Sequence, residues 1–106
     1  MAFKTASVVM APDGDPKKHR ASIKTSKIEI LVVVIELMNI DQAVNICKDL
    51  VDKEGVQAIS LCPGFTHAAV ARIATAVGEG VSISVARGDV PSVMITGGIL
   101  GQEEWF

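Results

Sequence analysis

The stretch ILVVVIELMNIDQAVNICKDLVDKEG (residues 30–55) joins an apolar strand to an amphipathic helix. Its first six residues are all aliphatic, and a continuous run rich in Val and Ile is typical of a strand covered on both faces. Asn39 and Gln42 follow three residues apart, the spacing of a capping box at a helix start. Apolar residues then recur at helical spacing up to the stop signal at Gly55. The stretch therefore predicts a strand over 27–37 and a helix after it.

Strand and helix patterns also alternate on both sides of this unit. Alternating or β-branched runs bounded by Gly and Pro predict strands, and apolar residues spaced three and four apart predict helices. The predicted elements are a strand at 3–11, a short helix at 16–23, a strand at 27–37, a helix at 39–55, a strand at 56–62, a helix at 66–77, a strand at 81–86 and a short strand at 92–95.

This alternation predicts right-handed crossovers and a parallel sheet. We expect a small three-layer α/β domain with a mainly parallel four- to five-stranded sheet and helices on both faces. A ferredoxin-like α+β arrangement is the main alternative, because the segment from Asp15 to Ser26 is a weak helix and would also serve as a loop between antiparallel strands. The length of 106 residues predicts one domain, 1–106, with 96–106 as a C-terminal tail.

Composition and charge limit the classes of partner. Hydrophobic residues make up 49% of the chain, which is high for so small a domain, and we expect a homo-oligomer that covers part of this surface. A formal charge of −2 argues against nucleic acid. The apolar run at 30–35 is too short to span a bilayer, so no membrane partner is expected. Two cysteines without secretory features predict a cytoplasmic protein with free thiols.

The chemically versatile side chains follow the predicted strands. In an open parallel sheet, ligands bind outside the carboxyl ends of the strands, so we expect a site there. The candidate residues are Asp13, Asp15, His19, Arg20, Glu36, Cys62, Gly64, Phe65, Thr66, His67 and Arg87.

The stretch ISLCPGFTH (residues 59–67) suggests the most specific chemistry. A helix beginning near Thr66 would direct its free N–H groups and positive dipole end toward Cys62, which would favour a thiolate or a bound anion. His67 would then be an acid or base for that thiol. The alternative interpretation is a buried cysteine before an ordinary Pro-Gly turn.

The other candidates each have an ordinary structural explanation beside the functional one. Asp13 and Asp15 would bind a metal or an amine, or be turn and cap residues. His19 and Arg20 would hold a carboxylate or phosphate, or lie on an exposed helix face. Glu36 would be a cleft carboxylate, or simply the first solvated residue after its strand.

Known cofactor motifs are absent from the sequence. It contains neither a P-loop nor a dinucleotide fingerprint, and no spacing of Cys and His supports zinc, so we predict no cofactor and no metal.

Three functions remain open from the residues alone. We expect first a small anionic ligand bound by Arg20, Arg87 and the amide groups after Cys62. The second is an enzyme that uses Cys62 with His67. The third is a structural or interaction module that docks through the C-terminal tail GGILGQEEWF.

The block AVNICKDLVDKEGVQAISLCPGFTHAAVARIATAVGEGVSISVAR (residues 43–87) resembles a family of short bacterial and archaeal proteins known only as a domain of unknown function. The resemblance begins at Asp15, and Cys62, Gly64, Phe65, His67 and Arg87 match the family pattern. Ser60 and Pro63 depart from it, because an acidic residue and a glycine usually stand there. The resemblance implies a compact stand-alone α/β protein with a polar rim, and it implies no reaction.

Overall fold

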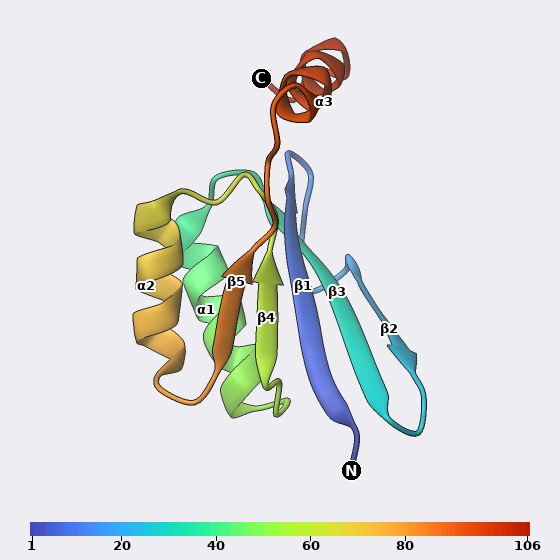
Figure 1. The fold of residues 1–106 in the computed structure, drawn as a ribbon, viewed down its shortest axis with the longest axis vertical. Coiled ribbons are helices and arrows are strands. Elements are labelled where there is room, and N and C mark those ends of the chain that lie inside the picture. Colours follow the sequence, from blue (N-terminus) through green and yellow to red (C-terminus); the bar gives the residue numbers. More distant parts are fainter.

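The computed structural model describes all 106 residues as one five-stranded sheet with three helices (Figure 1). The strand order across the sheet is β2-β3-β1-β4-β5. The elements are β1 (Phe3–Ala11), β2 (Arg20–Lys24), β3 (Ile28–Glu36), α1 (Ile40–Asp52), β4 (Ala58–Leu61), α2 (His67–Val77), β5 (Ser82–Val85) and α3 (Ser92–Gln102).

The sheet is mainly parallel, as predicted. β3, β1, β4 and β5 run in the same direction, and only the edge strand β2 is antiparallel to its neighbour β3. The longest pairing joins all nine residues of β1 to β3, from Phe3↔Ile28 to Ala11↔Glu36. This topology confirms the α/β class and rules out the ferredoxin-like alternative, whose sheet would be antiparallel.

The helix predicted at 16–23 is wrong, because the second half of that segment forms β2. Asp15 does begin one helical turn, since its carbonyl oxygen accepts a hydrogen bond from the His19 N–H at 2.7 Å. The chain then extends and pairs with β3 as a hairpin. The hairpin turn is stabilised by the Thr25 hydroxyl, which accepts a hydrogen bond from the Ile28 N–H at 3.1 Å. Pairing with the bare edge of β3 thus outweighs a short, weak helix pattern.

Helices α1 and α2 cover the same face of the sheet, so the prediction of helices on both faces is wrong (Figure 1). The chain passes from β3 through α1 to β4, and from β4 through α2 to β5, moving in one direction along the sheet. Successive right-handed crossovers in one direction place their helices on one face. The connection from β1 to β3, which would cover the other face, contains β2 instead of a helix. The domain therefore has two layers.

The core lies between this face of the sheet and the two helices. Alternate strand residues point into it, as the two-residue period of a strand requires. Its members are Ala6, Val8, Met10, Leu31, Val33, Ile35, Ala43, Cys47, Leu50, Val56, Ile59, Leu61, Phe65, Ala69, Ile73 and Val77.

Each core helix is capped by its own sequence. The Asn39 side chain accepts a hydrogen bond from the Gln42 N–H at 3.0 Å, and the Thr66 hydroxyl accepts one from the Ala69 N–H at 3.1 Å. The start of α1 was predicted from Asn39, and that of α2 near Thr66 from the spacing of apolar residues. The caps satisfy N–H groups that would otherwise lack a partner in the first turn.

The C-terminal helix α3 stands beyond the carboxyl ends of the strands, connected by an extended segment (Figure 1). The strand predicted at 92–95 is therefore wrong, and the tail predicted at 96–106 is mostly helical. Residues 92–95 have no neighbouring strand, whereas a helix satisfies backbone groups within its own segment. No residue of α3 is buried, and none of the three helices is long and apolar enough to cross a membrane.

Candidate functional site

The topology places a switch point between β1 and β4. The connection from β1 leads through β2 to β3 on one side, whereas the connection from β4 leads through α2 to β5 on the other side. Chains that leave neighbouring strands in opposite directions open a crevice outside the carboxyl ends of those strands. In this protein the crevice lies beside Met10 and the turn that begins at Cys62.

A cavity of about 390 Å³ occupies this position. Met10, Cys62, Pro63 and Gly64 form its floor at the strand ends. The C-terminal segment forms the other wall with Val93, Thr96, Gly97, Leu100, Trp105 and Phe106. The lining contains no charged residue, so the cavity suits an apolar group.

A smaller hollow of about 120 Å³ adjoins this cavity. The two share Pro63, Val93 and Thr96, and the hollow adds Arg87 and Asp89. The Arg87 Nε donates a hydrogen bond to Asp89 Oδ1 at 2.9 Å, whereas its two Nη groups have no partner within the chain. An apolar cavity and a guanidinium group with free donors therefore lie next to each other.

Cys62 lines the apolar cavity with a half-buried side chain. Its backbone N–H donates to the Val8 carbonyl oxygen at 3.1 Å and continues the ladder of the sheet. No hydrogen bond joins its thiol to His67, which is exposed at the first residue of α2 and does not line the cavity. The predicted Cys62–His67 pair is therefore not assembled in the structure.

The residues between Cys62 and α2 have separate roles. Gly64 lines the cavity, and it does not adopt a left-handed backbone conformation. Phe65 is 4% exposed and belongs to the core. Thr66 uses its hydroxyl to cap α2. Of these three predicted ligand contacts, only Gly64 lies at the cavity.

Most of the predicted site residues after β1 and β3 make hydrogen bonds within their own loops. Asp15 accepts a hydrogen bond from the Lys17 N–H through Oδ1 and donates its own N–H to His19 Nδ1 at 2.9 Å. Glu36 accepts one from Asn39 Nδ2 at 2.9 Å, beside the start of α1. Asp13 is exposed and makes no side-chain contact of this kind. None of them lines the cavity.

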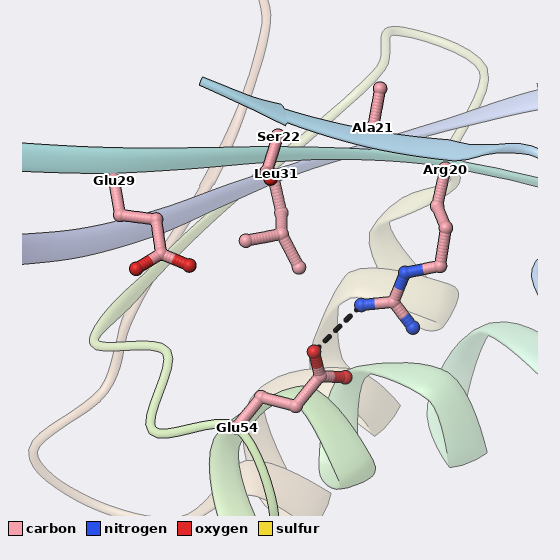
Figure 2. A pocket seen from close by; sticks show the side chains of 6 residues that line it. All are labelled: Arg20, Ala21, Ser22, Glu29, Leu31 and Glu54. Atoms are coloured by element: carbon pink, nitrogen blue, oxygen red, sulfur yellow. Dashed lines mark hydrogen bonds and ion pairs between the residues drawn. The ribbon is translucent and has the colours of Figure 1, made fainter. Parts of the chain in front are cut away.

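Arg20 does not line the cavity, because it lies in the edge strand β2, which runs antiparallel and pairs Arg20 with Val33 of β3. It binds Glu54 Oε1 at 2.7 Å, across a hollow of about 280 Å³ (Figure 2). In Figure 2, Arg20 and Leu31 both reach from the sheet toward Glu54, which follows the C-terminal end of α1. The ion pair bridges the sheet edge and the helix layer, so Arg20 and Arg87 do not form one anion site.

No cluster of three or more His, Cys, Asp or Glu side chains that could hold a metal ion is present. The two cysteines are free. Burial removes the Cys47 thiol from water, and this desolvation raises its pKa to about 12. The Cys47 thiol is therefore a neutral core group, and Cys62 is the thiol that a ligand in the cavity would contact.

The sequence reasoning missed most of the C-terminal wall. Leu100, Trp105 and Phe106 were recognised only as part of a possible docking tail, and Met10 was read as an ordinary strand residue. The available signal was the run VPSVMITGGILGQ (residues 90–102), which contains no charged residue. A charge-free run that ends near an aromatic pair is typical of a segment that packs on something.

The chain belongs to the family of unknown function DUF6506, whose pattern matches residues 3–94. The match covers all five strands, α1, α2 and the first three residues of α3. Searches found no significant match to a curated protein or to a solved structure.

Proposed function

We propose that this protein binds a small molecule with an apolar body and one anionic group. The apolar body would occupy the 390 Å³ cavity between the strand ends and α3, and the anionic group would reach Arg87. The observation that carries the proposal is the continuity of these two spaces at the switch point of the sheet. It keeps the anionic ligand that the sequence suggests, with Arg87 alone, and not Arg20 and Arg87 together, as the cationic anchor.

The cavity supports the apolar part of the proposal. Its volume lies within the range of about 300–1,000 Å³ that is common for ligand pockets. Met10, Leu100 and Trp105 offer aliphatic and aromatic surface, and their burial by a ligand would be favourable in proportion to the area removed from water. A fully hydrated anion such as phosphate would gain little from this lining.

Arg87 supports the anionic part. Its Nη groups are unpaired, and a guanidinium fork can donate two parallel hydrogen bonds to one carboxylate. Asp89 occupies only the Nε side, so it orients the guanidinium and leaves the fork open. Ser92 and Thr96 add hydroxyl groups around the same hollow.

Trp105 provides a direct readout, because it is the only tryptophan and it lines the cavity. We would titrate the protein with octanoate, 1-octanol and inorganic phosphate while recording Trp105 fluorescence. Octanoate should change the emission at the lowest concentration, 1-octanol at a higher one, and phosphate should have no effect. Arg87→Ala should weaken octanoate binding about tenfold, the loss expected for a charge-assisted contact, and leave 1-octanol unchanged.

Arg72→Ala is the matched control, since Arg72 pairs with Asp41 between α2 and α1, outside the cavity. It should bind octanoate as the unmodified protein does. The proposal would be wrong if neither octanoate nor 1-octanol altered Trp105 fluorescence. It would also fail in its anionic part if Arg87→Ala bound octanoate with undiminished affinity.

We also propose a reducing compartment, the cytoplasm, as the place of this function. Cys47 and Cys62 are both free thiols, and oxidising compartments usually convert such residues to disulfides. Oxidation of Cys62 in the cavity would introduce polar oxygen atoms into an apolar lining.

A further inference from the structure

One face of the sheet carries no helix and also lacks charge. The strand residues on this face alternate along each strand with the core residues. The only charged residue among them is Glu36, at the end of β3. Its β2–β3–β1 side is an aliphatic patch formed by Val9, Ala21, Ile23, Ile30, Val32 and Val34. A sheet face in contact with water normally carries polar and charged side chains, so this patch is suited to contact with protein.

Helix α3 presents a second uncovered apolar surface. Its cavity side carries Val93 and Leu100, whereas Met94, Ile95 and Ile99 lie on the opposite side at helical spacing. These three are 70%, 62% and 52% exposed. A helix that is apolar on all sides is normally buried on all sides.

The sequence of α3 is a poor helix former without such contacts. Three of its 11 residues are glycine, and no side chain caps its start. Short helices are marginal in water, and glycine weakens them further. Within one chain α3 buries no residue, so contact with a further surface would stabilise its helical state.

The exposed side of α3 cannot cover the aliphatic patch of its own chain. α3 lies beyond the carboxyl ends of the strands, with its cavity side turned toward Met10 and Cys62 (Figure 1). The opposite side, with Ile95 and Ile99, therefore points away from the chain's own sheet. The radius of gyration of 14.0 Å, above the value of about 13 Å usual for this length, reflects the position of α3.

We propose that a second copy of this chain covers both surfaces, with the Met94–Ile95–Ile99 side of each α3 packed on the aliphatic patch of the other copy. Each chain has one uncovered sheet face and one helix with an uncovered side. In a dimer with two-fold symmetry, the helix of each chain can therefore cover the sheet face of the other. Neither surface is charged, so no ion is left without a partner at the contact. Each sheet then has a helix on both faces, the third layer that its sequence pattern suggests.

The test uses two variants of the full chain, Val32→Lys in the patch and Ile95→Lys on α3. Val32 is 42% exposed and Ile95 is 62% exposed, so both lysines are compatible with the fold of a single chain. Light scattering should give about twice the chain mass of 11.2 kDa for the unmodified protein and about one chain mass for each variant. Met38→Lys, at an equally exposed apolar residue outside both surfaces, should remain a dimer.

Mixing the two variants identifies the contact. The Val32→Lys chain still offers an intact α3 and the Ile95→Lys chain still offers an intact patch, so the mixture should recover dimers that neither variant forms alone. Circular dichroism should show the same strand content in all three variants. A monomeric unmodified protein would overturn the proposal. So would a dimeric Ile95→Lys variant, because a dimer made by two sheet faces alone would not need α3.

Discussion

Helices α1 and α2 differ from α3 in the features that stabilise a helix within its own domain. The first two have a side-chain cap and three buried residues each. α3 has no side-chain cap, no charged residue and no buried residue. The same chain thus contains two helices that its own core stabilises and one that it leaves largely uncovered.

This difference coincides with a division of roles. Residues 3–85 contain the whole hydrophobic core, whereas the C-terminal segment supplies one wall of the cavity and the apolar side proposed for the dimer. The family match ends at residue 94, so Leu100, Trp105 and Phe106 lie outside it. The sheet domain is the part shared with the family, and the last 12 residues of this chain shape its proposed ligand and partner.

The largest contrast is expected between two isoleucines on different helices. Ile73 of α2 is fully buried, so Ile73→Ala should lower the free energy of unfolding by about 3 kcal/mol through lost contacts and a residual cavity. Ile99 of α3 is 52% exposed, and Ile99→Ala should cost less than about 0.5 kcal/mol in the monomer. Urea denaturation at low protein concentration measures both.

Protein concentration then separates the two helices further. The effect of Ile73→Ala should not depend on concentration, whereas that of Ile99→Ala should grow as dimers form. Equal losses for both variants at low concentration would contradict the contrast between α2 and α3.

The second expected effect concerns the pH dependence of the core. Burial raises the pKa of the Cys47 thiol to about 12, compared with 9.0 for the free group. Between these values the unfolded chain loses a proton that the folded chain keeps, so the folded state becomes less stable as pH rises. The free energy of unfolding should fall by about 1.4 kcal/mol per pH unit in this window.

Cys47→Ala removes this titration and is the control, because lysines and arginines titrate equally in both proteins. The difference in unfolding free energy between the two proteins should be constant below pH 9 and should shrink from pH 9 to 11. A difference that stays constant to pH 11 would show that folding does not hinder deprotonation of the Cys47 thiol. Cys62, at the cavity, should be alkylated in the folded protein, whereas Cys47 should react only after unfolding.

The sequence predicted the elements whose signals are local. The ILVVVI run located β3, the Asn39 cap located α1, and the helical spacing of apolar residues located α2, because such signals act within a few positions. The expected site was placed at the carboxyl ends of the strands from the rule for parallel sheets, and a cavity lies there beside the turn after β4. Local signals were sufficient for the elements, and the predicted parallel order supplied the position of the cavity.

The errors arose where the structure depends on distant segments. Residues 20–24 became a strand because the edge of β3 was free to pair, and residues 92–95 became helical because no strand was available beside them. Arg20 was placed on the same rim as Arg87 because residues 16–23 were predicted to form a helix after β1, whereas residues 20–24 form an edge strand. The antiparallel direction of β2 is a property of the whole sheet, and no pattern within β2 reports it.

The smallest expected effect comes from the cap that distinguishes α2 from α3. Thr66→Ala removes the hydroxyl that accepts the Ala69 N–H, and it should lower the free energy of unfolding by about 1 kcal/mol. Thr75→Ala, an exposed change of the same kind within α2, should be neutral or slightly stabilising because alanine is the better helix former. Hydrogen exchange should show faster exchange of the Ala69 amide in Thr66→Ala only. If Thr66→Ala were as neutral as Thr75→Ala, the start of α2 would be held by packing alone, and the caps would not distinguish the core helices from α3.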